Sequence, residues 1–236
     1  MKRFQAQAIA RLTVIAAFLH AVASGSSSRA QEHVSFPTQD GGLVYADVYG
    51  KGDRGVVLAH GGRFNKESWK AQAQSLSAAG FRALAFDFRG YGRSRGPGQS
   101  DPLSAPLRYD VLAAVRYLRS TGARTVSVVG GSMGGGAAAE ASMAAQPGEI
   151  DRLVLLAAPA GGPSEKLKVR KLFIVSRDDL GSDGKPRLSE IRAQYERAPE
   201  PKELVILEGA AHAQAIFQTH QGGRLMGEIL RFLSSP

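Results

Sequence analysis

The chain has 236 residues, of which 43% are hydrophobic and 22% are charged, and it contains no cysteine. This composition is close to that of globular proteins and excludes a disordered or fibrous chain, and the length suits one domain of good size or two small ones. The lack of cysteine excludes disulfide scaffolds, thiolate nucleophiles and cysteine-ligated zinc or iron–sulfur sites.

The net charge is +9, with 30 lysines and arginines against 21 acidic residues. Four of the basic residues lie in residues 1–30, which hold no acid, so the remaining 206 residues carry only +5. Aromatic residues do not interleave with the basic ones, as a stacking platform for nucleic acid requires. We therefore interpret the excess of positive charge as a solvated cationic surface and expect no nucleic-acid partner. A module that binds an anionic surface is the weaker alternative.

Residues 1–30 have the three parts of a secretory signal peptide: a basic start, an apolar stretch from Leu12 to Ala23, and small residues up to Ala30. The apolar stretch is shorter than the ~20 residues that a transmembrane helix needs, so no stable membrane insertion is expected after cleavage. We predict a cleaved signal peptide over 1–30, cut after Ala30 or alternatively after Ala23, and a mature domain over 31–236 that is secreted or periplasmic. An amphipathic N-terminal helix or a mitochondrial-type presequence is the alternative.

After residue 32, strand and helix patterns alternate. The segments HVSF and LVYADVY flank the turn signal Asp40-Gly41-Gly42 and predict an antiparallel hairpin. Six apolar runs typical of buried strands follow, at residues 56–60, 82–88, 125–130, 152–159, 171–176 and 203–209. Apolar residues at helical spacing lie between and after them, at about 66–79, 106–121, 133–146, 187–198 and 214–234.

Buried-type strands separated by helices indicate an α/β fold, with a mostly parallel central sheet of about eight strands and helices on both faces. Only about ten residues connect the strand that ends at Pro159 to the one that starts at Lys171, so no cap domain is expected. In sheets of this kind, ligands bind beyond the carboxyl ends of the strands. The segments that directly follow the strands are therefore the places to look for functional residues.

The segment Gly130-Gly131-Ser132-Met133-Gly134 follows the apolar run TVSVV and leads into a helix of small residues. It matches G-x-S-x-G, the pattern of a nucleophile on a very tight strand-to-helix turn. Such a turn needs positive φ at the serine and leaves no room for Cβ atoms two positions to either side, which explains the two glycines. It also places Ser132 at a helix N-terminus, where free N–H groups favour developing negative charge. We predict that Ser132 is a catalytic nucleophile, with a tight turn without chemistry as the alternative.

With this motif, the chain resembles the α/β-hydrolases, and in particular the small members without a lid. The resemblance covers about residues 33–234: VVLAHGGRFNKESW resembles the family's oxyanion loop, and DFRGYGRS resembles its Asp-x-Arg-Gly-x-Gly-x-Ser signature. It implies the α/β-hydrolase fold, and a nucleophile, an acid and a base in that order along the chain. Asp87 and Arg89 of the signature are expected to fix loops.

The family order implies an acid after the strand KLFIVS, where Asp178 and Asp179 are adjacent. Alignment with the family's Gly-x-x-Asp selects Asp179, and a slip of one residue in the turn would select Asp178. The implied base is His212, which follows the last strand after a Gly-Ala-Ala loop. Of the other histidines, His60 is expected to brace its loop and His220 to lie inside the last helix.

The resemblance also implies two backbone donors that bind an oxyanion. One is the N–H of Met133, the residue after the nucleophile, and the other is the N–H of Gly62 in the loop after VVLAH. Arg63 is the neighbouring candidate for the second donor, or else its side chain or that of Phe64 lines the acyl pocket. The sequence has no phosphate-binding glycine pattern and no metal-ligand spacing, so neither a metal nor a cofactor is expected.

These residues together predict an exported, carboxylesterase-like serine hydrolase that cleaves an ester-type (acyl) bond in a small-molecule substrate through an acyl-enzyme. Peptidase, thioesterase, dienelactone hydrolase or haloperoxidase-like chemistry is the alternative within this fold, because the fold alone does not fix the substrate. A non-catalytic binding domain is the alternative from another class. The complete order of Ser132, Asp179 and His212 argues against it.

Overall fold

The computed structural model describes residues 31–101 and 104–235. The predicted signal peptide and both of its cleavage sites lie outside these residues and stay predictions. In the part of the chain that the structure describes, no helix is long and apolar enough to cross a membrane.

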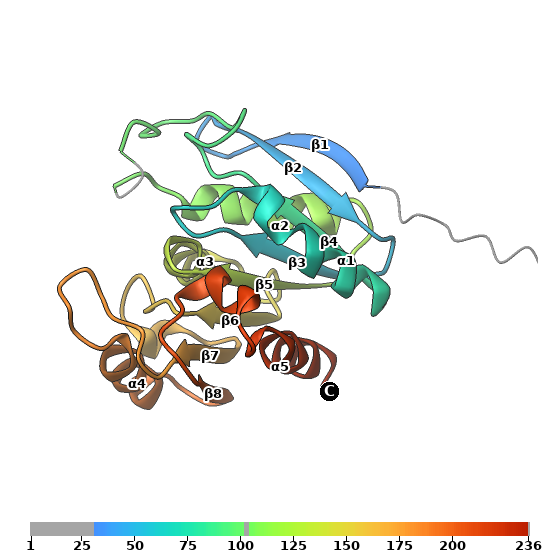
Figure 1. Cartoon of the computed structure of the whole chain (residues 1–236). Coiled ribbons are helices and arrows are strands. Elements are labelled where there is room, and N and C mark those ends of the chain that lie inside the picture. The colour runs from blue at the N-terminus through green and yellow to red at the C-terminus, as the bar shows by residue number, and fades with distance from the viewer. Residues whose placement is uncertain (1–30, 102–103, 236) are drawn as a thin grey trace, which may run out of the picture.

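Eight strands form one sheet in the order β1-β2-β4-β3-β5-β6-β7-β8 (Figure 1). The strands are β1 Gln31–Pro37, β2 Leu43–Tyr49, β3 Arg54–Ala59, β4 Phe81–Phe86, β5 Thr125–Gly131, β6 Arg152–Leu156, β7 Arg170–Ser176 and β8 Lys202–Leu207. β2 pairs antiparallel with β1 and with β4, and the other neighbours are parallel. The mostly parallel sheet of about eight strands is therefore confirmed, together with the hairpin at its edge.

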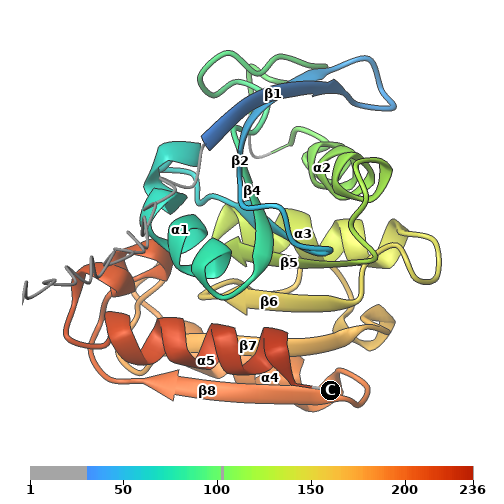
Figure 2. The same cartoon turned by 90° about the vertical axis from the view of Figure 1, so that its right-hand side faces the viewer.

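Helices cover both faces of this sheet, as predicted. They are η1 Lys66–Trp69, α1 Lys70–Ala78, α2 Arg108–Ser120, α3 Met133–Ala144, η2 Ser164–Lys166, α4 Arg187–Arg197, η3 Ala213–Gln218 and α5 Gly222–Ser234, where η marks a short 3-10 helix. Figure 2 shows α1 and α5 on one side of the twisted sheet, and their apolar residues share one core cluster. The apolar residues of α2, α3 and α4 belong to the cluster on the other side.

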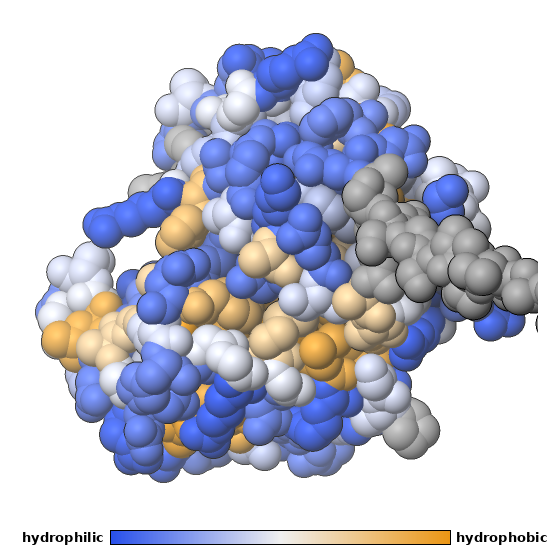
Figure 3. All heavy atoms as spheres, turned by 45° about the vertical axis from the view of Figure 1, so that its right-hand side comes forward, coloured by the Kyte–Doolittle hydropathy of each residue, from blue (hydrophilic) through white to orange (hydrophobic). Residues whose placement is uncertain are grey.

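Alternation along the strands divides the core between these two clusters. Val57 and Ala59 of β3 pack in the cluster with α2, α3 and α4, whereas Val56 and Leu58 pack in the cluster with α1 and α5. Because β3 is buried on both faces, its sequence is a continuous apolar run and not an alternating one. On the molecular surface, Figure 3 shows apolar residues gathered in a band across the middle of one face, with mainly hydrophilic residues above and below it.

The prediction of a single helix at 214–234 is wrong, because the structure divides this segment into η3 and α5. Thr219 between them is extended, with φ −104° and ψ 173°, and its carbonyl accepts the N–H of Gly222 at 3.0 Å. A Cβ atom at Gly222 would collide with the carbonyl of Phe217, so the turn requires a glycine there. His220, which was expected inside the last helix, lies in this turn.

Between β6 and β7 the chain forms only a loop and η2, so the described residues contain no cap domain, as predicted. Among the described residues, the carboxyl edge of the parallel strands is bordered by the loops and helix ends that follow the strands.

Candidate active site

Three of the predicted site residues meet at the carboxyl edge of the sheet. Ser132 follows β5, Asp179 lies in the turn after β7, and His212 lies in the loop after β8. His212 Nδ1 is 2.7 Å from Asp179 Oδ2, and His212 Nε2 is 2.8 Å from Ser132 Oγ. Because an ionised carboxylate can only accept hydrogen bonds, Nδ1 carries the ring proton and Nε2 accepts the serine hydroxyl. In this tautomer the ring can take the serine proton while the carboxylate stabilises the resulting imidazolium.

Ser132 has φ 51° and ψ −119°, a conformation that non-glycine residues rarely adopt. The glycines on either side make the turn possible: a Cβ atom at Gly130 would collide with the carbonyl of Gly134, and one at Gly134 would collide with the carbonyl of Ala59 in β3. The N–H of Ser132 donates to Leu156 O at 2.9 Å and ties the turn to β6. The steric reason that G-x-S-x-G suggests thus operates in the structure.

Backbone strain gathers at the same edge. Three described non-glycine residues have positive φ, namely Ser132, Ala157 (50°) and Ala213 (49°). Ala157 directly follows β6, and Ala213 directly follows His212. Each such residue costs on the order of 1–3 kcal/mol and persists only where its surroundings fix it. The strain therefore lies where the predicted chemistry requires fixed side chains.

The two adjacent acids have different surroundings. The side chain of Asp179 is only 2% exposed, and one of its oxygens accepts the hydrogen bond from His212. Asp178 is exposed, and its backbone N–H donates to Gly209 O at 3.0 Å. The geometry thus agrees with the alignment that selects Asp179, and not with the alternative, Asp178.

The two predicted oxyanion donors are neighbours. A Cβ atom at Gly62 would stand 3.6 Å from Met133 Sδ, and Met133 is the first residue of α3, where N–H groups have no partner within the helix. Tyr91 donates its hydroxyl to Gly62 O at 2.9 Å and holds this loop from the outside. The side chains of Arg63 and Phe64 line the adjoining pocket, which is the second role that the sequence suggests for them.

His60 braces the loop that carries Gly62, as expected. Its side chain is completely buried. The N–H of Phe88 donates to His60 Nε2 at 3.2 Å, so Nδ1 carries the proton and donates to Gly61 O at 2.9 Å. Burial lowers the pKa of His60 to about 4, which keeps the ring neutral.

Sequence reasoning misses Gln214, which joins the histidine loop to the oxyanion loop. Its Oε1 accepts the N–H of Gly61 at 2.7 Å, and its Nε2 donates to Ser68 Oγ at 2.6 Å. The side chain is buried and lies two residues after His212. No pattern could have marked it, because its partners lie 153 and 146 residues earlier in the chain.

Two pockets border Ser132. The smaller has a volume of about 530 Å³ and is lined in part by Glu140, and the larger, of about 750 Å³, includes His212 and Arg63. Arg187, which sequence reasoning also misses, lines both pockets. Among the described residues, no group of three or more histidine, aspartate or glutamate side chains is arranged to hold a metal ion.

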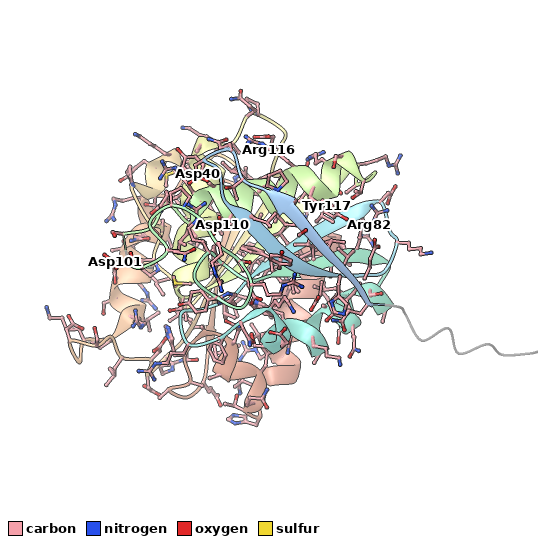
Figure 4. The ribbon with its side chains drawn as sticks, turned by 90° about the horizontal axis from the view of Figure 1, so that it is seen from above. Asp40, Arg82, Asp101, Asp110, Arg116 and Tyr117 are labelled. Atoms are coloured by element: carbon pink, nitrogen blue, oxygen red, sulfur yellow. The ribbon has the colours of Figure 1, made fainter. Side chains whose placement is uncertain are left out.

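A cluster formed by Asp40, Arg89 and Asp110, here called the closed cluster, lies after β4. Arg89 is fully buried and donates to both carboxylates at 2.6–3.0 Å and to Pro97 O at 2.9 Å. Figure 4 shows Asp40, from the β1–β2 turn, beside Asp110, from α2. Burial opposes ionisation of Arg89, but its hydrogen bonds to the carboxylates outweigh burial and raise its pKa. Arg89 thus fixes loops, as expected.

Burial affects the two carboxyl groups of the closed cluster unequally. Asp110 is completely enclosed, and burial raises its pKa despite the contact with Arg89. Asp40 is 18% exposed, and its hydrogen bond from Arg89 lowers its pKa. One arginine therefore joins two acids of different basicity.

Comparison with known proteins agrees with this fold. The chain matches the family model described as alpha/beta hydrolase fold over residues 55–177, which is more than half of its length. The matched range contains Gly62, Ser132 and Met133 and ends before Asp179 and His212.

The AB hydrolase superfamily protein YisY of Bacillus subtilis (strain 168) is 27% identical over 218 residues, which cover 88% of this chain and 75% of that protein. The non-heme chloroperoxidase CPO-A1 of Kitasatospora aureofaciens is 32% identical over 123 residues, but the match spans only 42% of its length and 51% of this chain. The Pyrococcus furiosus esterase Pf2001 superposes with a TM-score of 0.74 at 20% identity, covering 87% of this chain and 92% of the esterase, which shows a shared fold. The chain belongs to the α/β-hydrolase fold family.

Proposed function

We propose that this chain is an exported serine hydrolase that cleaves an ester-type bond in a small-molecule substrate. The observation that carries the proposal is the continuous hydrogen-bonded chain from Ser132 Oγ through His212 to Asp179, with distances of 2.8 and 2.7 Å. It stands on a strained strand-to-helix turn that exposes the hydroxyl at the end of the sheet, where α/β enzymes bind their substrates.

The mechanism follows from this geometry. Ser132 Oγ attacks the ester carbonyl while His212 Nε2 takes its proton, and the N–H groups of Met133 and Gly62 bind the oxyanion. The tetrahedral intermediate collapses to an acyl-enzyme as His212 returns the proton to the leaving alcohol. A water molecule, activated by the same ring, then attacks the acyl group and releases the acid and free Ser132. Asp179 holds the ring in the required tautomer throughout.

The surroundings support a small ester with a short acyl chain. The two pockets that border Ser132 can divide the acyl and alcohol parts of the substrate, and no cap domain among the described residues lengthens either pocket. An esterase is among the solved structures that share this fold. The haloperoxidase named among the relatives matches only half of this chain, and no contact of the site favours its chemistry over ester hydrolysis.

The test is labelling with a fluorophosphonate, followed by hydrolysis of 4-nitrophenyl esters from acetate to decanoate. The wild-type protein should be labelled on the peptide that contains Ser132 and should prefer the short esters. Ser132→Ala should abolish labelling and lower kcat by several orders of magnitude, since triads that lose a member retain only ~10³–10⁴-fold catalysis over water. Ser142→Ala is the matched control, because this serine lies on α3 and its hydroxyl has no hydrogen-bond partner among the described residues. A Ser132→Ala protein that is still labelled and active would disprove the proposal.

Export is tested separately. The apolar stretch from Leu12 to Ala23 supports a signal peptide, so the mature protein should start near Gln31 or Ser24 and be found outside the cytoplasm. Sequencing of the N-terminus in each cell fraction measures this. Met1 retained on a cytoplasmic protein would contradict export and would leave the hydrolase mechanism untouched.

A further inference from the structure

Arg187 is fixed beside the predicted acid, but its side chain makes no hydrogen bond to any residue that the structure describes. Its backbone N–H donates to Asp179 O at 2.9 Å, which holds the start of α4 against the acid turn. Its Nε is 3.6 Å from Asp179 Oδ1, within ion-pair range but beyond a hydrogen bond. This Nε is buried and has no hydrogen-bond partner among the described residues. The guanidinium, with five N–H donors, is thus held in place and unused.

A purely structural role does not account for this arrangement. An arginine that served only to hold Asp179 would be expected to meet the carboxylate with two short parallel hydrogen bonds, the geometry that a guanidinium and a carboxylate favour. Here the contact is single and long, and Asp179 directs its other oxygen to His212. A buried donor without a partner is uncommon in native proteins, and it shows that Arg187 is not placed to complete the hydrogen bonds of Asp179. The terminal N–H groups of the same guanidinium also donate to no described residue, and they are the donors that a ligand in the pocket could use.

The pockets indicate where such a ligand would lie. Arg187 lines both pockets that border Ser132. In the smaller pocket it faces the same space as Glu140, whose carboxylate would repel an anion. Of the described residues that line the larger pocket, two are arginines, Arg187 and Arg63, and one is an acid, Asp101. The larger pocket is therefore the cationic one, and the smaller pocket suits an uncharged group.

We propose that Arg187 binds a carboxylate of the substrate in the larger pocket, so that the enzyme prefers esters that carry a free carboxylate at some distance from the scissile bond. This rests on the proposed function and names its substrate class. The planar guanidinium recognises a carboxylate through two parallel hydrogen bonds, which lysine cannot reproduce. One edge of the guanidinium faces Asp179, and the same group lines the pocket. Arg187 can therefore contact the substrate and the catalytic acid at the same time.

The experiment uses two pairs of esters and compares each pair between proteins, so that the intrinsic reactivity of the esters cancels. One pair is 4-nitrophenyl hydrogen adipate and methyl 4-nitrophenyl adipate, with the charge on the acyl side. The other is 4-carboxyphenyl butyrate and its methyl ester, with the charge on the alcohol side. For the wild-type protein, kcat/KM should favour the carboxylate in at least one pair by about tenfold or more, and that pair identifies the part of the substrate that enters the larger pocket.

Arg187→Gln should reduce this preference by roughly 10- to 100-fold, because kcat/KM should fall much further for the carboxylate than for the neutral ester, mainly through KM. Arg187→Lys should fall between the two proteins, because it keeps the charge and loses the planar guanidinium. Arg177→Gln is the matched control: Arg177 is an exposed arginine of the turn that carries Asp179, it lines neither pocket, and its loss should leave the preference unchanged.

Two results would overturn the proposal: a wild-type protein without preference for the carboxylate in either pair, or an Arg187→Gln protein in which both members of a pair slow equally. The second result would mean that Arg187 acts only on Asp179. Calorimetric binding of monomethyl adipate and of dimethyl adipate to Ser132→Ala separates this proposal from ester hydrolysis itself. If the wild-type protein cleaves no ester but the carboxylate binds and its binding requires Arg187, the hydrolase function fails and the anion site stands. If monomethyl adipate binds no more tightly than dimethyl adipate, the proposed anion site is disproved.

Discussion

Two charged clusters at the carboxyl edge of the sheet differ in how many hydrogen bonds the arginine of each one donates. In the closed cluster, the guanidinium of Arg89 is completely buried, and its donors are all taken by Asp40, Asp110 and Pro97 O. In the second cluster, formed by Asp179, Arg187 and His212 and here called the open cluster, the guanidinium is partly exposed and donates to no described residue. The closed cluster holds loops together, whereas the open cluster has donors left over for a ligand.

The comparison shows why burial of charge alone does not identify a functional site. Both arginines pair with acids, and Arg89 is the more deeply buried of the two. What differs is the number of donors that the protein itself satisfies. A buried ion pair whose hydrogen bonds are complete is structural, and one with unused donors beside a pocket is a candidate for binding.

The largest expected effect concerns the acid of the open cluster. Asp179→Asn should lower kcat by up to ~10⁴-fold at a pH near 8, with little loss of stability, because the amide no longer holds His212 in the required tautomer. Asp178→Asn should change kcat little, since this side chain is exposed and Asn can make the same local hydrogen bonds. Both are measured on the same 4-nitrophenyl ester. The reverse result would show that Asp178 is the catalytic acid. If neither substitution lowered kcat, the catalytic acid would not lie in this turn.

The next effect separates the two arginines by stability. Arg89→Met should lower the free energy of unfolding by about 3–5 kcal/mol, because it leaves the buried carboxylate of Asp110 and the partly exposed carboxylate of Asp40 without the guanidinium. Arg187→Met should change it by less than about 1 kcal/mol, since this side chain makes no hydrogen bond that the fold depends on. Urea unfolding of both variants measures the difference. Equal losses would show that the open cluster is also structural.

A third effect concerns His60, near the closed cluster. The pKa of this buried ring is about 4 in the folded protein, below the unfolded value of 6.5, so the unfolded state binds more protons between these values. The stability contribution is therefore complete above pH 6.5 and is lost as the pH falls toward 4. Between pH 7 and pH 5 the loss should be about 2 kcal/mol.

The reference for this measurement is His60→Gln, which should lose less stability over the same range. The difference between the two proteins isolates the histidine from Asp87 and Asp110, whose pKa values burial raises and whose effect on stability has the opposite sign. Parallel curves for the two proteins would show that His60 titrates normally in the folded state.

The last prediction tests the connection between the two loops of the site. Gln214→Ala leaves the N–H of Gly61 buried without an acceptor, so the free energy of unfolding should fall by about 1–3 kcal/mol. It also releases the oxyanion loop from the histidine loop, so kcat should fall by about tenfold with KM nearly unchanged. Gln218→Ala, an exposed glutamine of η3, is the control and should change neither. A loss of stability without a change in kcat would make Gln214 a structural residue only.

The parts of the fold that sequence reasoning predicted are those where a local cause is visible. The strands were found because burial on both faces requires continuous apolar runs, as in β3 and β5. The elbow at Ser132 was found because its two glycines have a steric cause within five residues of sequence. The break between η3 and α5 was missed, because Leu225, Ile229 and Phe232 keep the helical period and do not show where the helix begins.

The parts that were missed depend on contacts between distant segments. Gln214 and Tyr91 act on the loop at Gly61 and Gly62, and neither side chain differs in sequence context from an ordinary polar residue. In the sequence, Arg187 marks only the start of a predicted helix, because its contact with Asp179 arises when the segment folds back onto the acid turn. Sequence alone therefore supplied the side chains of the predicted chemistry but not the residues that surround them.

The way in which the segment between Asp179 and Arg187 is closed has a practical consequence. Besides the backbone hydrogen bond between these two residues, Leu180 and Pro186 form an isolated bridge, and Gly181 N–H donates to Lys185 O at 2.8 Å. The loop at residues 181–185 therefore begins and ends at one fixed point, and its length can vary without displacing Asp179 or α4. Since doubling a flexible loop costs only about 0.6 kcal/mol, residues 181–185 form a natural insertion point. Longer sequences placed there would build a new wall over the larger pocket, which Leu180 and Gly181 already border, and would diversify substrate selection on an unchanged catalytic frame.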